Sequence, residues 1–211
     1  MWCTRVYMSD SQEHWNKVYS TRAENEVSWF QVEAQHSLAA VAACKLASDA
    51  GILDVGGGAS RLVDGLLARG YRDITVLDLS PVALSSARAR LGELGADVTW
   101  MAANIVEFEP PQQYALWHDR AVFHFLTEAA DRAAYVRVLE RALPPGGHLL
   151  VSTFAPDGPE RCSGLQVQRY NADALAAEFG ASFTRVSQER QEHLTPGGKM
   201  QPFTYVRLVR R

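Results

Sequence analysis

Short apolar runs alternate with longer helical patterns from residue 52 to the end of the chain. Five runs are expected to form strands: 52–55, 73–78, 97–101, 114–119 and 148–154. Repeated strand–helix–strand units of this length form a parallel sheet with helices on both faces. Two more strand-like runs, 183–190 and 203–209, are joined by a short turn and should pair antiparallel at one edge. The sequence therefore predicts a doubly wound α/β fold, a mostly parallel seven-stranded sheet with an antiparallel C-terminal edge strand and helices on both faces.

The first 50 residues differ in character from the rest of the chain. They are rich in aromatic residues and helical in pattern, and an alanine-rich helix is expected at 32–48. The whole chain has 211 residues, a length typical of one structural domain. We expect residues 1–50 to form a helical arm that caps a ligand site, and residues 51–211 to form the core.

Charge and cysteine content exclude several classes of protein. The 21 basic and 24 acidic residues give a net charge of -3, whereas a dedicated nucleic-acid-binding protein has a basic excess. Cys3, Cys44 and Cys162 are far apart in the chain, so neither a disulfide framework nor a zinc cluster is expected. No run approaches the roughly 18 apolar residues of a membrane span. We expect a cytoplasmic protein whose partners include neither nucleic acid nor membrane.

The strongest local signal is the glycine-rich stretch DVGGGAS at 54–60, between an expected strand and an expected helix. Glycines let the backbone turn tightly and approach a ligand closely. Asp78 ends the next strand, where a carboxylate can accept both hydroxyls of a ribose. The combination predicts an adenosine-containing cofactor, and the alternative is a structural turn beside a surface aspartate. Arg61 stands where a dinucleotide-binding GxGxxG needs glycine, and Asp54 suits a cationic cofactor better than a pyrophosphate.

These residues resemble the motifs of the class I (seven-stranded, Rossmann-like) S-adenosylmethionine-dependent methyltransferases. ILDVGGGAS is similar to the family's acidic-x-Gly-x-Gly-x-Gly motif, with Ser60 in place of the third glycine, and LPPGG is similar to its LxPGG turn. The segments HWNKVY…SWF and HDRAVFHFL are also similar to small bacterial members. The resemblance implies the cofactor S-adenosylmethionine and the product S-adenosylhomocysteine. It also implies these cofactor-binding residues: Trp15, Tyr19, Trp29, Asp54, Gly56, Gly57, Gly58, Ser60, Asp78, Leu79, Asn104, Ile105 and His118.

The fourth expected strand ends at the sequence WHDR, beside the glycine-rich stretch if the strands are ordered as in this family. We expect His118 and Asp119 to line the reaction centre, and His118 or His124 to accept a proton from the acceptor. The alternatives are that His118 orients a strand end and that His124 is a core histidine. No metal site is expected, because adjacent side chains such as His118 and Asp119 point to opposite faces of a strand.

The acceptor site is expected beyond the carboxyl ends of the fourth and fifth strands. The stretch FAPDGPERCSGL, which contains Asp157, is either a gating loop over the substrate or a plain surface connection. The N-terminal aromatic side chains are either a lid that excludes water from the sulfonium or ordinary packing. The candidate substrate-binding residues are Arg120, Phe123, Phe154, Arg161 and Cys162.

The favoured function is an S-adenosylmethionine-dependent methyltransferase that acts on a small-molecule acceptor by in-line displacement. A protein substrate is the second hypothesis, because the N-terminal and HDRAVF segments are distantly similar to seven-stranded protein-lysine methyltransferases. A catalytically silent cofactor-binding protein and a nicotinamide oxidoreductase are the remaining alternatives. The Pro-Pro-aromatic tetrad of enzymes that methylate nucleic-acid amines is missing after the fourth strand, where WHDR stands.

Overall fold

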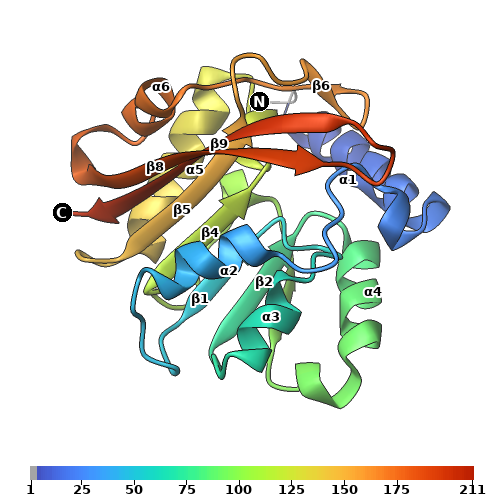
Figure 1. Ribbon diagram of the computed structural model, residues 1–211, viewed down its shortest axis with the longest axis horizontal. Helices are drawn as coiled ribbons and strands as arrows, with labels where there is room; N and C mark the ends of the chain where they lie inside the picture. The colour runs from blue at the N-terminus through green and yellow to red at the C-terminus, as the bar shows by residue number, and fades with distance from the viewer. Residues whose placement is uncertain (1–3) are drawn as a thin grey trace.

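The computed structural model describes the backbone of residues 4–211 and the side chains from Asp10 onward, so Cys3 lies outside the described residues. One sheet has the strand order β3-β2-β1-β4-β5-β9-β8 (Figure 1). The strands are β1 (Ile52–Val55), β2 (Ile74–Asp78), β3 (Thr99–Ala102), β4 (Leu116–Arg120), β5 (His148–Phe154), β8 (Phe183–Leu194) and β9 (Met200–Arg210). Strands β1 to β5 pair in parallel, and β9 lies antiparallel between β5 and β8. The predicted fold class is confirmed, with the antiparallel pair at one edge of the sheet.

The strand order reverses beside β1. The chain adds β2 and β3 on one side of β1 and then returns to add β4 on the other side. In this register Asp54 is paired with His118, and Val55 with Asp119. Ligands of open parallel sheets bind at the carboxyl ends of the strands, where the order reverses. The topology therefore places a candidate site at the ends of β1 and β4.

Helices cover both faces of the sheet (Figure 1). They are α1 (Thr4–Thr21), α2 (Gln35–Ala42), α3 (Leu62–Ala68), α4 (Pro81–Leu91), α5 (Ala129–Ala142) and α6 (Ala172–Ala177). Helices α2, α3 and α4 pack on the face that contains Ile52 and Leu116, and α5 and α6 pack on the face that contains Leu53 and Trp117. Neighbouring residues of a strand point to opposite faces, which explains why both sides of β1 are buried. None of the described helices is long and apolar enough to cross a membrane.

Helix α4 begins where the sequence predicts. Ser80 is the N-cap residue and its hydroxyl accepts a hydrogen bond from a backbone N–H of the first turn, while Pro81 is the first helical residue. Leu84, Ala87, Leu91 and Leu94 recur at helical spacing, which predicts one apolar stripe, but the helix ends at Leu91 because Gly92 has a φ of 55°. Leu94, which was expected on the apolar stripe, is consequently 77% exposed.

Two segments differ from the sequence-based expectation. The alanine-rich helix expected at 32–48 is limited to α2, and the chain turns after it at Lys45, which has a φ of 54°. The stretch that follows β5 forms a small hairpin of β6 (Arg161–Cys162) and β7 (Leu165–Gln166). This hairpin has no local pattern of alternating polarity, so the sequence did not indicate it.

Helix α1 is attached to the loop that follows β2. Gln12 Nε2 donates a hydrogen bond to Leu79 O at 3.0 Å, and Ser80 Oγ donates to Asn16 Oδ1 at 2.7 Å. These contacts join the N-terminal arm to the carboxyl end of β2, the edge of the sheet at which the strand order predicts a ligand.

Candidate functional site

A crevice opens at the carboxyl ends of β1 and β4, between the glycine-rich turn and the N-terminal arm. It is lined from the core by Asp54, Gly56, Gly57, Ser60, His118 and Arg120, and from the arm by Glu24, Trp29, Phe30 and Ser37, among others. Residues singled out in the sequence at widely separated positions thus come together in one place.

The glycine-rich turn packs directly against two carboxylates. Gly56 has a φ of 67°, and the N–H groups of Gly56 and Gly57 both donate to Leu77 O, at 2.7 and 3.2 Å. A Cβ atom on Gly57 would lie 2.5 Å from Asp54 Oδ2, and one on Gly58 would lie 2.6 Å from the Oδ2 atom of the aspartate that ends β2. A side chain at either position would therefore displace one of the two carboxylates, which explains why glycine is needed there.

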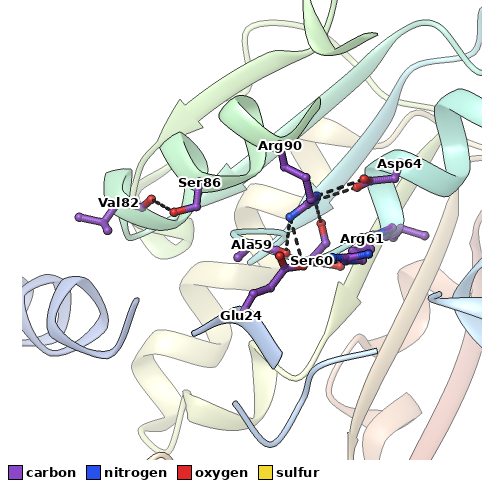
Figure 2. A network of polar contacts seen from close by, with 9 residues as sticks. Glu24, Ala59, Ser60, Arg61, Asp64, Val82, Ser86 and Arg90 are labelled. Carbon is purple, nitrogen blue, oxygen red and sulfur yellow. Dashed lines mark hydrogen bonds and ion pairs between the residues drawn. The ribbon is translucent and has the colours of Figure 1, made fainter. Parts of the chain in front are cut away.

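Arg90 of α4 holds the far end of this turn (Figure 2). Its Nη1 donates to Ala59 O at 3.0 Å, and its Nη2 donates to Ser60 O at 2.8 Å. The same guanidinium pairs with Asp64 at 2.7 Å and with Glu24 of the arm at 3.3 Å. Sequence reasoning missed Arg90, because no local pattern marks a residue whose partners lie 26 to 66 positions away.

Replacement of Arg90 by Met should loosen the turn. Two backbone carbonyls and two carboxylates lose their shared donor, which should lower the free energy of unfolding by about 1–3 kcal/mol. The affinity for S-adenosylhomocysteine, the ligand that the resemblance implies, should fall severalfold. Arg88→Met is the matched control, since Arg88 is exposed on the same helix. Calorimetric titration and chemical denaturation test both variants, and equal effects of the two substitutions would contradict the assigned role.

A buried chain of hydrogen bonds lies beneath the crevice. Asp54 Oδ1 is 2.7 Å from His118 Nδ1, and His118 Nε2 is 2.9 Å from Ser37 Oγ. Because a carboxylate can only accept, we assign the Nδ1 proton to His118 and let Nε2 accept from the Ser37 hydroxyl. Both ring nitrogens are therefore engaged within the protein, an arrangement that orients Asp54. That His118 accepts a proton from the acceptor substrate stays a prediction.

The second oxygen of Asp54 is aimed at the glycine-rich turn. Asp54 is 2% exposed, and its Oδ2 atom has no hydrogen-bond partner among the described residues. Burial of a carboxylate oxygen without a partner is unfavourable. A cationic ligand group in the crevice would supply that partner, so the residues present fit a ligand of the kind that the resemblance implies.

Asp78 ends β2 on the other side of the turn. Its Oδ1 accepts a hydrogen bond from Ser80 N at 2.7 Å. Burial raises the pKa of this carboxyl to about 7 against the lowering effect of that bond, and the nearby charge of Asp54 adds to the increase. A carboxyl group whose pKa lies near neutral pH, packed against the glycine-rich turn, is suited to accept hydrogen bonds from ligand hydroxyls.

The catalytic role expected for the Asp119 side chain needs correction. Its carboxylate points away from the crevice and accepts hydrogen bonds from Val122 N, Phe123 N and the Tyr135 hydroxyl. Burial raises its pKa to about 6, although these donors act in the opposite direction. Asp119 therefore anchors the turn after β4 and the neighbouring helix α5. His118 and Asp119 do face opposite sides of the strand, and the side chains described from Asp10 onward contain no group of three potential metal ligands.

His124 is a core histidine, which corrects its expected role as a proton acceptor. It is fully buried, and its ring packs 4.5 Å from the ring of Phe125 and 4.9 Å from that of Phe154. Burial lowers its pKa to about 3, and the charge of Arg120 adds to the effect. A neutral imidazole enclosed by aromatic rings has no access to a reacting group.

The cofactor-binding residues expected after β3 have structural roles in this chain. Asn104 caps a short 3-10 helix, with its Oδ1 accepting from Val106 N at 3.3 Å. Ile105 is buried in the core cluster around α5. The expected contact of Asn104 and Ile105 with an adenine stays a prediction. The side chain of Ile105 faces the core.

The aromatic residues of the arm form one cluster. The ring of Trp15 lies 5.7 Å from that of Trp29 and 5.2 Å from that of Phe125, and Tyr19 lies 6.1 Å from Trp29. Burial raises the pKa of Tyr19, and the charge of Asp78 contributes. The cluster therefore joins the arm to the crevice wall, where Trp29 is a lining residue.

Of the five candidate substrate-binding residues, Arg120 lines the crevice. Phe123, Phe154 and Cys162 are buried in the core clusters, and burial raises the pKa of the Cys162 thiol to about 12. Arg161 is exposed and donates to the backbone of its own hairpin. These four assignments are corrected: the first three are packing residues and the fourth holds a surface turn. In the same stretch Asp157 forms a surface ion pair with an arginine of β8.

Comparisons with known proteins identify a domain in the central part of the chain. A family model described as "Methyltransferase domain" matches residues 52–147. A ubiquinone biosynthesis O-methyltransferase of Marinobacter nauticus is 32% identical over 103 residues, which are 48% of this chain and 43% of that protein. The chain thus spans less than half of the length of this curated relative.

Solved structures resemble the chain over nearly its full length. One comes from work on the conversion of a disulfide bond into a thioacetal group during echinomycin biosynthesis. It has a TM-score of 0.76 and 21% sequence identity, and the match covers 94% of this chain and 92% of that one. Another is the N-methyltransferase NodS of Bradyrhizobium japonicum in complex with S-adenosylhomocysteine. It has a TM-score of 0.68, 17% identity and coverage of 92% and 97%. At these identities the likeness concerns the fold.

Proposed function

The chain belongs to the class I S-adenosylmethionine-dependent methyltransferases by its methyltransferase domain and its fold, and on that premise we propose that it methylates a small-molecule acceptor. The observation that carries the proposal is the buried, unpartnered Oδ2 atom of Asp54 beside the glycine-rich turn. A methyl donor with an ammonium group supplies the cation that this oxygen lacks.

Residues on both sides of the turn have chemistry suited to the donor. When bound, S-adenosylmethionine supplies an activated sulfonium methyl group, so the protein needs chiefly to align and desolvate it. Asp54 accepts hydrogen bonds from the ammonium group in this proposal, and Asp78 accepts from the ribose hydroxyls. Leu79 and Asn104 lie on the adenine side. His118 is a positioning residue that keeps Asp54 in place.

The N-terminal arm has a separate role in the proposal. Residues 1–50 cap the donor, and Trp15, Tyr19 and Trp29 exclude water from the sulfonium. The ring contacts among these residues and the two hydrogen bonds from α1 to the loop after β2 support this role. A covered crevice of this kind favours an acceptor small enough to enter beneath the arm.

The relatives also support a small acceptor. The curated relative is named for O-methylation in ubiquinone biosynthesis, and other matches are named nodulation protein S and malonyl-[acyl-carrier protein] O-methyltransferase. Since the names include O-methyltransferases and the N-methyltransferase NodS, the proposal leaves the acceptor atom open.

Radiolabelled S-adenosylmethionine tests this function directly. Purified protein is incubated with the donor and either a panel of small acceptors or proteins of a cell lysate, and label is counted in each fraction. We expect label in the small-molecule fraction and no excess in protein. Label confined to protein would favour a protein-lysine methyltransferase, whereas tight donor binding without any transfer would favour a silent binding protein. Either result would overturn the proposal.

A further inference from the structure

Arg120 extends from the end of β4 into the crevice and is held in one orientation. Its Nε donates to the Tyr205 hydroxyl at 3.0 Å, and its Nη1 donates to Trp29 O at 3.3 Å. The guanidinium carbon lies 4.7 Å from the centre of the Phe203 ring, within reach of a cation–π contact. Three contacts thus fix the guanidinium plane at the crevice wall.

The positive charge of Arg120 lacks an anionic partner. Its Nη2 atom is buried without a hydrogen-bond partner, and none of the ion pairs formed by the described side chains includes Arg120. Burial lowers the pKa of His124 and of His193, and the Arg120 charge lowers both further. A charged guanidinium with one buried, unpartnered nitrogen is unfavourable unless a ligand supplies a hydrogen-bond acceptor, best of opposite charge.

Arg120 and Asp54 line the same crevice from neighbouring strands, but Arg120 has its contacts on the other side of β4. Its neighbour across the sheet is Ser152 of β5, and the neighbour of Ser152 on β9 is Tyr205. Asp54 and Asp78 lie instead at the ends of β1 and β2. The cation therefore enters the crevice from the side of β5 and β9, whereas Asp54 enters it from β1.

We propose that the acceptor carries a carboxylate on an apolar body, and that Arg120 binds this carboxylate through Nη2. The inference rests on the proposed function and adds the chemical class of the substrate. Trp29, which lines the crevice beside the guanidinium, flanks the apolar body in this proposal. An arginine held by hydrogen bonds and ring stacking is preorganised, which favours recognition of a carboxylate over a neutral analogue.

Binding of benzoate and benzamide to the full chain saturated with S-adenosylhomocysteine tests the proposal. Wild-type protein should bind benzoate at least tenfold more tightly than benzamide, as measured by ligand-observed NMR titration. Arg120→Gln should remove this preference, Arg120→Lys should keep part of it, and Tyr205→Phe should reduce it. Arg207→Gln should leave it unchanged, because Arg207 also has a buried unpartnered nitrogen but lies outside the crevice lining.

Other outcomes separate the competing sources of the anion. If Arg120→Gln weakens S-adenosylhomocysteine binding as strongly as benzoate binding, the guanidinium serves the carboxylate of the donor and the proposal is wrong. Equal binding of benzoate and benzamide by the wild type would also overturn it, as would a methylated acceptor without an anionic group. Failure of all methyl transfer, with the benzoate preference intact, would count against the proposed function alone. Melting temperatures establish that each variant is folded.

Discussion

Valine at position 56 should abolish binding of S-adenosylhomocysteine. Gly56 has a φ of 67°, a backbone conformation that a β-branched residue adopts at a cost of about 1–3 kcal/mol. A Cβ atom at this position would also lie 2.0 Å from Val122 Cγ2. Relief of this overlap requires movement of the Val122 side chain or of the glycine-rich turn, and the glycine-rich turn forms one wall of the crevice.

Gly70→Val is the control that separates the effect of backbone strain on stability from the effect of a distorted crevice on ligand binding. Gly70 has a φ of 84° and no atom within 4 Å of a built Cβ, and it ends α3 away from the site. This control should lose a similar 1–3 kcal/mol or so of stability and keep its affinity for the ligand. Calorimetric titration gives the affinity, and denaturation gives the free energy of unfolding. A folded Gly56→Val protein with wild-type affinity would remove the glycine-rich turn from the binding site.

The parts of the fold predictable from sequence are those set by local patterns. The expected strands at 52–55 and 148–154 agree with β1 and β5 residue for residue, because both are buried on two faces and bounded by glycine or proline turns. The start of α4 was predicted for a similar reason, since Ser80 and Pro81 act within one turn of the helix. Neither case depends on distant contacts.

The candidate site could be located from sequence, but the roles of its side chains could not. Strand alternation correctly placed His118 and Asp119 on opposite faces, yet the pattern could not say which face was the crevice. The face that Asp119 occupies is fixed by Tyr135 of α5, whose hydroxyl donates a hydrogen bond to the Asp119 carboxylate. Ser37 and Arg90 were missed, because their partners are brought to them by the strand order and by helix packing.

Asp78→Asn should weaken donor binding and stabilise the free protein. Neutral Asn keeps an oxygen that can accept from Ser80 N, but it loses the charged acceptor for two ribose hydroxyls. The affinity for S-adenosylhomocysteine should fall by about 1–3 kcal/mol at pH 8, measured by calorimetry. The free energy of unfolding should rise at the same pH, because the wild type must keep a buried carboxylate ionised there. A fall in both quantities would indicate a structural role for Asp78 in place of the proposed one.

The pH dependence of wild-type binding gives an independent test of this assignment. The folded-state pKa of Asp78 is about 7, above its ordinary value of 3.8, so its carboxylate is formed as the pH rises through 7. Donor affinity should therefore increase by roughly tenfold between pH 6 and pH 8. Stability should change in the opposite sense: the folded state binds the extra proton, so the free energy of unfolding falls as the pH rises from about 4 to about 7.

Asp119, with a pKa of about 6, titrates in the same window, so Asp78→Asn should keep part of the stability slope and lose the rise in affinity. An Asp78→Asn protein whose affinity still rose tenfold would assign the titration to another group in the crevice.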